Sequence, residues 1–264
     1  MPKVAIVTPD KRKAAPLPEG LAGNGRAEAY LSGDKDPIHA WLHRLAKGEK
    51  LVVGPMANDC LGYVWEGEVR AGGLALPAGS SLIAEHGETI TIEGSGEGEA
   101  LVLTFRGAGP AGHGREGGHV HLLPVDKVPG SAELSGPTVG GDMHADSQCE
   151  TCSVWLHANH FGPSEPLPPE VAARGVHSHT EDEVIFITRG AIRLGQKLFP
   201  AGTAVAIAGD TMYSIAPGPE GMSFINFRAG TPSDIQFAAG GSMSETQYWK
   251  DRVAKPEYLS PVAA

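Results

Sequence analysis

An internal repeat constrains the fold of this chain more than any other feature of its sequence. Two pairs of segments match at an offset of 123 residues, a third matches at 122, and a fourth at 114. The pairs are 61–69 with 184–192, 74–79 with 197–202, 103–109 with 225–230, and 41–43 with 155–157. Four matches in one order predict two copies of the same unit. The second copy carries about nine extra residues, supplied by the segment GPSEPLPPEVAARG.

Short strands separated by turns are the main secondary structure that the sequence predicts. Short apolar segments alternate with Gly and Pro, which number 36 and 21, and this pattern is typical of an all-β sandwich or barrel. The expected strands are 39–45, 61–66, 68–72, 81–84, 89–93 and 100–106 in the first copy, and 153–160, 176–179, 183–188, 191–194, 203–207, 212–216 and 222–228 in the second. One short helix is expected at 244–253, capped by Ser244.

The repeat divides the chain into two all-β units. We expect an N-terminal unit of residues 1–130 and a C-terminal unit of residues 131–264. The segment 125–142 is rich in Gly, Pro and Ser and is the expected linker between them.

Charge and composition exclude several classes of partner. The net charge is −10 and the longest basic cluster is Lys11-Arg12-Lys13, which argues against nucleic acid and anionic membranes. No apolar run approaches the ~20 residues that span a bilayer, and the N-terminal segment lacks the apolar stretch of a signal peptide. Three cysteines are too few for a disulfide scaffold, and their odd number suits a reducing compartment. We therefore expect a cytoplasmic protein.

Cys149 and Cys152 form one isolated Cys-x-x-Cys pair, with His144 five residues upstream. A zinc site usually needs a second pair of ligands, and a redox pair usually opens a helix that follows a strand. Neither context is visible in the sequence. We expect a solvated pair in a loop, with a peripheral metal or a disulfide as the alternatives.

Residues 175–190 (GVHSHTEDEVIFITRG) carry three candidate metal ligands. Residues two apart on a strand face the same side, so His177 and His179 project together, and Glu183 shares their parity if the strand resumes after the bend at residues 180–182. Two imidazoles and one carboxylate leave open coordination positions on a first-row divalent metal. The carboxylate also balances the charge of a cation in an apolar barrel.

The spacing His177-x-His179-x3-Glu183-x6-Gly190 resembles the first motif of the cupins, and with the repeat the whole chain is similar to a bicupin. The resemblance implies two double-stranded β-helix (jelly-roll) barrels with a divalent transition metal in the mouth of one. Iron(II) is the first candidate, with manganese, nickel and zinc as alternatives. Cupins commonly dimerise through sheet edges, which makes a homodimer the expected assembly.

The second cupin motif, Gly-x5-Pro-x-Gly-x2-His-x3-Asn, is largely lost. Counted from Gly202, only that first glycine remains; Ala208 replaces the proline, and Tyr213 stands where the last metal-binding histidine is expected. A phenol has a reference pKa of ~10, and a nearby divalent cation favours its phenolate. Some cupin lyases are similar in using a tyrosine near the metal. Tyr213 is therefore expected as a fourth metal ligand or an acid–base group, with Glu183 as the second catalytic residue. The alternative is that Tyr213 only fills the pocket.

The first copy lacks the ligand set. The residues at the four positions equivalent to the expected ligands are Gly54, Met56, Cys60 and Ile90. We expect the N-terminal barrel to bind no metal and Cys60 to be a buried apolar residue.

The remaining histidines and arginines fall into three groups. His157 and His160 share a strand with opposite parity, so at most one faces inward; His160 is the candidate for the substrate pocket, because His157 has a counterpart, His43, in the first copy. Arg106 and Arg228 correspond across the repeat, which favours a shared structural role. The histidines expected in solvated loops are His39, His86, His113 and His144, and His119 and His121 are expected on a connecting strand.

The sequence therefore predicts a metal-dependent enzyme that acts on a small oxygen-rich substrate such as an oxo-acid, a diketone or a phenol. The wide use of His-x-His-x3-Glu by oxygen-using cupins favours a non-haem dioxygenase. Tyr213 as a base favours the alternative, a non-redox lyase or isomerase. A cupin that holds such a small molecule without turnover is the third reading.

Overall fold

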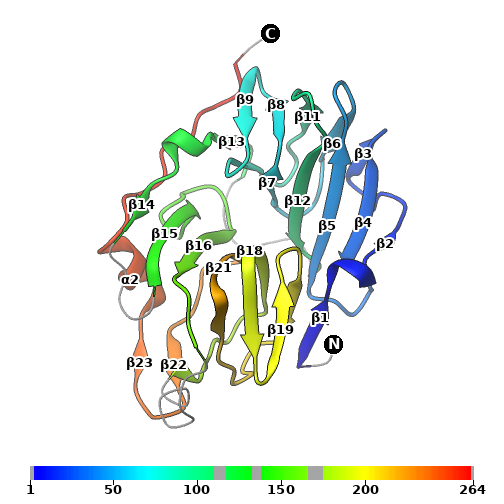
Figure 1. Cartoon of the computed structure of the whole chain (residues 1–264). Coiled ribbons are helices and arrows are strands. Elements are labelled where there is room, and N and C mark those ends of the chain that lie inside the picture. The colour runs from blue at the N-terminus through cyan, green and yellow to red at the C-terminus, as the bar shows by residue number, and fades with distance from the viewer. Residues whose placement is uncertain (1–2, 110–116, 133–137, 166–174, 263–264) are drawn as a thin grey trace. The chain divides into compact units, whose positions relative to one another are not determined.

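The structure, a computed structural model, describes residues 3–109, 117–132, 138–165 and 175–262 (Figure 1). The chain forms two compact units. The C-terminal unit comprises Met1–Lys11, Pro129–Ser147 and Trp155–Lys255, and the N-terminal unit comprises Arg12–Val128, Gln148–Val154 and Pro256–Ala264. The main boundary, after Val128, lies close to the expected division after residue 130. Three segments cross the expected division. Residues 1–11 belong to the C-terminal unit, and the loop 148–154 and the tail from Pro256 belong to the N-terminal unit.

An eight-stranded antiparallel sheet forms most of the C-terminal unit. Its order is β1 (Val4–Val7), β20 (Ala204–Ile207), β18 (Glu183–Leu194), β21 (Ala216–Arg228), β16 (Trp155–Phe161), β15 (Thr138–Ala145) and β14 (Gly130–Ser131), with β19 (Lys197–Pro200) paired to β18. A small sheet contains β17 (His177–Ser178), β22 (Ile235–Phe237) and β23 (Ser242–Met243), and the unit also has a short 3-10 helix, η1 (Pro9–Lys11). The expected C-terminal helix is α2 (Glu245–Lys250), whose N-cap is Ser244.

Two antiparallel sheets form the N-terminal unit. The seven-stranded sheet has the order β13 (Val120–Leu123), β10 (Ser81–Ala84), β7 (Cys60–Glu66), β12 (Ala100–Gly107), β5 (Ile38–Leu45), β4 (Arg26–Leu31) and β2 (Lys13–Ala14). The five-stranded sheet has the order β3 (Leu21–Gly23), β6 (Lys50–Val53), β11 (Ile90–Gly94), β8 (Glu68–Ala71) and β9 (Leu74–Pro77). A 3-10 helix, η2 (Val125–Lys127), follows β13.

The same strand order recurs in the two large sheets, which confirms the repeat. Strands β18 and β21, side by side in Figure 1, correspond to β7 and β12 of the other unit. Leu61 pairs with Phe105 in one sheet and Val184 with Phe227 in the other. Leu61 and Val184 are related by the predicted offset of 123 residues, and Phe105 and Phe227 by the offset of 122. The sheet register therefore repeats along with the sequence.

One of the four sequence matches is two residues out of register. Trp41 pairs with Thr104, and His157 pairs with Asn226, at equivalent positions of the two sheets. The structural counterpart of His157 is therefore Trp41, and not His43 as the Trp-Leu-His match suggests. A shift of two residues leaves every side chain on the same face of its strand, so an apolar pattern cannot reveal it.

The strand β1 completes the C-terminal sheet in the place that β13 takes in the N-terminal one. It pairs with β20 from Val4–Ile207 to Val7–Ala204, as β13 pairs with β10 from Val120–Ala84 to Leu123–Ser81. Its sequence, Val-Ala-Ile-Val, is rich in the β-branched residues that favour strands. No strand was expected in this segment from the sequence, and the structure places Val4–Val7 at the edge of the C-terminal sheet.

Two further expectations need correction. The segment 212–216 is not a strand: it contributes an isolated bridge between His177 and Tyr213, and β21 starts only at Ala216. The expected linker 125–142 contains η2, β14 and the start of β15, which pairs with β16. Strand β15 was not predicted because its sequence, TVGGDMHA, contains two glycines, and glycine is depleted in strands.

Each unit has its own apolar core. The N-terminal core contains buried residues from both of its sheets, among them Val53, Leu76, Ile92 and Val102. The core of the C-terminal unit includes Ile185, Ile187, Val205 and Phe224. Within the described ranges, no helix has the length and apolar character needed to cross a membrane.

Candidate active site in the C-terminal unit

A cavity of about 310 Å³ lies in the C-terminal unit and brings together three of the four predicted site residues, His177, His179 and Tyr213. Its other polar lining residues are His157, Asn159, Asn226, Arg228 and Glu245. Its apolar lining includes Phe161, Ile185, Ile215, Phe224, Ile235, Phe237 and Met243. The fourth predicted residue, Glu183, is buried at the start of β18 and contacts two of the lining residues, Asn226 and Arg228.

Backbone pairing fixes Tyr213 beside His177. Each residue donates its N–H to the carbonyl of the other, and both N···O distances are 2.9 Å. Nδ1 of His177 donates to the carbonyl oxygen of Gly175 over 2.8 Å. Because Nδ1 carries the proton in this arrangement, Nε2 of His177 is left with a lone pair that can bind a metal.

Gly209, four residues before Tyr213, packs against the loop that carries His179. A Cβ on Gly209 would lie 2.2 Å from the carbonyl oxygen of Thr180, so no other residue fits without a backbone shift. Gly209 N–H donates to Asp182 over 3.0 Å, and Asp210 N–H donates to the carbonyl of His179 over 2.6 Å. These contacts set the bend between His179 and Glu183.

The rings of the predicted residues converge on the cavity. The ring centroids are 5.2 Å apart for His177 and His179, 4.6 Å for His177 and Tyr213, and 6.2 Å for His179 and Tyr213. The rings of His177 and His179 meet edge to face, with an interplanar angle of 87°. His177, His179 and Tyr213 therefore line one cavity, although His177 and His179 do not lie on one continuous strand with Glu183.

Arg228 occupies the centre of this cluster, a position that sequence reasoning missed. Its Nη2 lies 3.2 Å from Nε2 of His179 and 3.1 Å from Oε2 of Glu183. The side chain is 1% exposed. The match of INFRAG with LTFRGAG pointed to this arginine, but a repeat cannot show that one copy contacts acidic residues and the other does not.

Glu245 at the start of α2 is the second missed residue. Its Oε2 accepts a hydrogen bond of 2.5 Å from Nη1 of Arg228 and lies 3.5 Å from Nδ1 of His179. Its Oε1 lies 3.3 Å from Nε2 of His157. Burial disfavours its charge, but Arg228 and His157 hold the pKa of Glu245 well below its ordinary value, so it stays ionised. The only sequence feature that points to Glu245 is its place in the first turn of the expected helix 244–253.

The ionisation of the other residues follows from the same contacts. Burial alone would raise the pKa of Glu183, but Arg228, followed by His179, lowers it. Burial lowers the pKa of His179, and Arg228 lowers it further, which keeps the imidazole neutral. Burial, reinforced by the charge of Glu183, raises the pKa of Tyr213 well above 10. The cluster thus contains two carboxylates, one guanidinium, a neutral imidazole and a neutral phenol that can donate a proton.

The donor set fits a divalent metal if the Arg228 side chain moves away from His179 and Glu183. A guanidinium has no acceptor, so Nε2 of His179 must accept its hydrogen bond with a lone pair. Oε1 of Glu183 is buried without a hydrogen-bond partner among the described residues. Among the described residues, one group of His, Cys and Glu donors has all its ligand atoms within 4.8 Å of one another, and it does not include His177, His179 or Glu183. The ligand atoms of these three residues would therefore have to move closer together to bind one ion.

His157, and not His160, faces this cavity. The two residues point to opposite sides of β16, as their parity predicts. His160 forms hydrogen bonds with Asp142 (2.9 Å) and Ser223 (3.0 Å) and borders a separate surface depression with Val139 and Arg189. The expectation that His160 contributes to the pocket is thus corrected: the two-residue slip in the Trp-Leu-His match assigned His157 the wrong counterpart.

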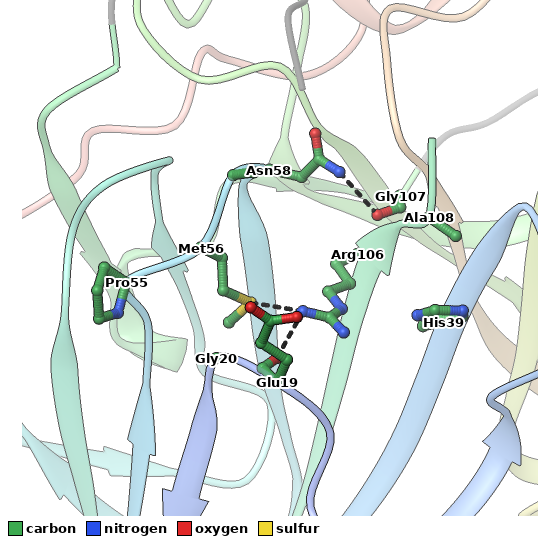
Figure 2. Close-up of a pocket in the computed structure, with 10 residues that line it drawn as sticks. Glu19, Gly20, His39, Pro55, Met56, Asn58, Arg106, Gly107 and Ala108 are labelled. Carbon is green, nitrogen blue, oxygen red and sulfur yellow. Dashed lines mark hydrogen bonds between the residues drawn. The ribbon is translucent and has the colours of Figure 1, made fainter. Parts of the chain in front are cut away.

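The equivalent region of the N-terminal unit has an arginine but no ligand set. Figure 2 shows Arg106 beside Met56 in a cavity of about 360 Å³. Nη1 of Arg106 donates to Sδ of Met56 over 3.1 Å and to the carbonyl oxygen of Glu19 over 2.8 Å. Met56 is equivalent to His179, so the arginine contacts the same position in both units. Cys60, equivalent to Glu183, is buried, which raises the pKa of its thiol to about 12.

Three other expectations concern single histidines and the cysteine pair. His144 is buried on β15, which lowers its pKa to about 4, so it is not solvated. Cys149 and Cys152 are also buried, contrary to the expectation of a solvated pair. His113 lies outside the described residues.

Comparison with known proteins supports the fold. No model of a known protein family matches the sequence, and no curated protein matches it. Solved structures do match. YlbA of E. coli, assigned to the family DUF861, is 16% identical with a TM-score of 0.62, over 86% of this chain and 90% of that one.

Two further structures have a similar fold. Oxalate decarboxylase of Lactobacillus farciminis is 11% identical with a TM-score of 0.62, over 93% of this chain and 90% of that one. A proposed dioxygenase of Nostoc punctiforme is 12% identical with a TM-score of 0.62, over 100% of this chain and 89% of that one. At these identities the likeness concerns the fold, and the chain therefore has the all-β cupin fold that its His-x-His-x3-Glu motif predicts.

Proposed function

We propose that the C-terminal unit is the catalytic unit of a metal-dependent enzyme that acts on a small oxygen-rich substrate. The observation that carries the proposal is the convergence of His177, His179 and Tyr213 on one cavity, with Glu183 and Arg228 behind them. A buried group of titratable residues around a cavity is typical of a catalytic site.

The residues that would hold the metal are His177 and His179 through Nε2, Glu183 through Oε1, and Tyr213 through its hydroxyl. When bound, a divalent metal supplies Lewis acidity to the oxygen atoms of a substrate. Imidazole and carboxylate ligands suit iron(II), manganese, nickel and zinc alike, with iron(II) as the first candidate. One fold relative, the 12% identical oxalate decarboxylase of Bacillus subtilis, is described with Mn(II) centres.

The cavity favours a small substrate with a polar end and a short apolar body. Its volume of about 310 Å³ is at the lower end for small-molecule sites. Oxygen atoms of the substrate can accept hydrogen bonds from the hydroxyl of Tyr213 and the amide of Asn226, while Ile185 and Phe224 contact the hydrocarbon part. Oxo-acids, diketones and phenols have this character.

Proton transfer is the reaction type that the geometry supports best. Tyr213 is held as a neutral phenol by burial and by the charge of Glu183, and it borders the cavity. A positioned phenol can donate a proton to the substrate, and the neighbouring Glu183 carboxylate stabilises the proton on Tyr213 between turnovers. We therefore place a lyase or isomerase reaction first.

A dioxygenase is the second candidate. The apolar lining formed by Phe161, Ile215, Phe224 and Phe237 can admit dioxygen and keep water away from the polar residues. The motif His177-x-His179-x3-Glu183 also led to this class from the sequence.

One experiment separates the candidates. The protein is loaded in turn with iron(II), manganese(II) and zinc(II), and turnover of a panel of oxo-acids, diketones and phenols is measured in air and under argon. Equal turnover under argon, or activity with zinc, supports the lyase or isomerase. Oxygen uptake stoichiometric with product supports the dioxygenase. Stoichiometric binding without turnover in any condition indicates a ligand-binding protein and contradicts both.

The double variant His177→Ala, His179→Ala tests the location of the site. It is expected to lose metal-dependent turnover while keeping its fold. His160→Ala is the matched control, because His160 lies outside the cavity and is expected to leave turnover unchanged. Full activity in the double variant would place the reaction elsewhere.

A further inference from the structure

We propose that Glu85, His121, Cys149 and Cys152 form a zinc site in the N-terminal unit, separate from the cavity described above. Each of the four residues offers one donor atom, and these four atoms all lie within 4.8 Å of one another. All four belong to the N-terminal unit, because the loop 148–154 packs with that unit although it follows β15 in the chain.

Sheet pairing brings Glu85 and His121 together. Glu85 directly follows β10, and His121 lies on β13, where it pairs with Ile83. The carboxylate of Glu85 accepts a hydrogen bond of 2.6 Å from Nε2 of His121 and one of 2.9 Å from the backbone N–H of His119. These bonds fix the direction in which the carboxylate and the imidazole point.

Two contacts hold the cysteine loop against this pair. The hydroxyl of Thr151 donates to Glu85 over 2.6 Å, and the N–H of Ser153 donates to Asp59 over 2.6 Å. Sγ of Cys149 lies 3.9 Å from Nε2 of His121. The loop therefore presents its cysteines to the same point as Glu85 and His121.

The distances suit a small tetrahedral ion. Ligand atoms bound to zinc at 2.0–2.3 Å lie about 3.3–3.8 Å from one another. The Cys149–His121 separation is already close to this range, and the His121–Glu85 hydrogen bond has to open as the ion enters. The N–H of Cys152 donates to Sγ of Cys149 over 3.1 Å. A charge-assisted hydrogen bond of this kind stabilises a thiolate.

Burial and charge explain why a cation belongs here. Glu85 is 1% exposed, Cys149 4% and Cys152 1%. Among the described residues, the Glu85 carboxylate accepts hydrogen bonds from a backbone N–H, a hydroxyl and an imidazole, none of which is permanently charged. A buried carboxylate without a permanent cation is costly, and a divalent ion relieves this cost. Soft thiolate ligands with one imidazole select zinc among the common divalent metals.

The structure joins Cys149 and Cys152 as a disulfide, with Cα atoms 5.6 Å apart. The zinc site uses the same two residues as thiolates, so the reduced protein is the form that binds the ion. The metal then ties the loop 148–154 to β10 and β13, and its binding adds directly to the stability of the N-terminal unit. The second ligand pair, whose absence argued against zinc in the sequence, is supplied by distant residues.

The test starts with the whole protein, reduced and freed of metal without air. Cobalt(II) is added as a probe, and the thiolate-to-cobalt charge-transfer absorption is recorded. We expect one equivalent of cobalt to produce this band and zinc to displace it. In the same sample, zinc should protect Cys149 and Cys152 from alkylation, as read by peptide mass spectrometry.

Four variants assign the site. Cys149→Ser, Cys152→Ser should lose the cobalt band, and Glu85→Gln should weaken cobalt binding at least tenfold. His177→Ala, His179→Ala should keep the band, which separates this inference from the proposed function. Cys60→Ala is the control for an unrelated thiol and should keep it too. If zinc leaves both loop cysteines of the reduced parent protein open to alkylation, the proposal is wrong, whether or not the variants fold.

Discussion

Arg228 donates a hydrogen bond of 3.2 Å from Nη2 to Nε2 of His179, the nitrogen that we propose as a metal ligand. The other nitrogen, Nδ1, faces Glu245 at 3.5 Å, so the imidazole is held as the Nδ1–H tautomer. The same guanidinium group binds Glu183. One permanent cation therefore holds two of the predicted ligands in their metal-binding ionisation states.

The arginine is a feature of both copies of the repeat. Arg106 contacts Met56 as Arg228 contacts its equivalent, His179. The two copies differ in the surrounding charges: Cys60 stands where Glu183 does in the C-terminal unit. We infer that the contact belongs to the scaffold, and that acidic and imidazole groups around Arg228 convert it into a polar cluster.

Replacing Arg228 should destabilise the C-terminal unit strongly. Arg228→Met leaves Glu183 and Glu245 buried without their cation, and breaking a buried pair in this way costs about 3–5 kcal/mol. Urea unfolding measures this loss. A divalent metal should restore part of it in the variant, because the ion replaces the missing positive charge.

Arg106→Met is the matched control in the other copy. In the part of the chain that the structure describes, the Arg106 guanidinium donates to a carbonyl oxygen and a thioether and to no carboxylate, so its replacement should cost about 1 kcal/mol. Equal losses in the two variants would contradict the assignment of Arg228 to a charged cluster.

Tyr213→Phe should lower turnover roughly 10²-fold or more while leaving the fold intact. The phenylalanine keeps the ring contact with His177 but removes the hydroxyl, which is the proposed proton donor. The measurement is kcat for the best substrate of the panel, together with bound metal per chain. Activity within a factor of two of the parent would return Tyr213 to a packing role.

The repeat made the overall fold predictable because sheet register repeats with the sequence. Gly190 and Gly202 have positive φ angles of 69° and 82°, and their counterparts Gly67 and Gly79 have 75° and 88°. This conformation favours glycine, so these matches identified equivalent positions reliably. The Trp-Leu-His match lies within a strand, where a shift of two residues leaves the apolar pattern intact. It led to the choice of His160 over His157.

The candidate site was predictable only where its residues are close in sequence. His177, His179 and Glu183 share one segment, and Tyr213 followed from the position of Gly202. Glu245 reaches the cluster from a helix beyond β23, and Glu85 reaches the cysteine pair from 64 residues away (149 − 85). Contacts of this kind depend on how strands and loops pack, which one sequence does not encode in any local pattern.

Gly209→Ala should disturb the loop between His179 and Glu183. The added Cβ would lie 2.2 Å from the carbonyl oxygen of Thr180, so the backbone must move, at a cost of about 1–3 kcal/mol. We expect a lower melting temperature and weaker metal binding at His177 and His179. Gly98→Ala is the control: a Cβ there meets nothing within 4 Å, and the change should stay within about 0.5 kcal/mol.

Acid should destabilise the N-terminal unit through His43. Burial lowers the pKa of His43 to about 4, below the ~6.5 of an unfolded histidine, and its Nε2 is paired with the hydroxyl of Thr104 over 2.8 Å. Because the unfolded chain binds the proton more tightly, this contribution to stability is complete above pH ~6.5 and is lost as the pH falls toward 4. At pH 5 the loss is about 2 kcal/mol. Urea unfolding of the parent and of His43→Gln between pH 4 and 8 measures it, and the variant should show the shallower dependence. An identical pH dependence in both proteins would mean that His43 does not titrate in this range.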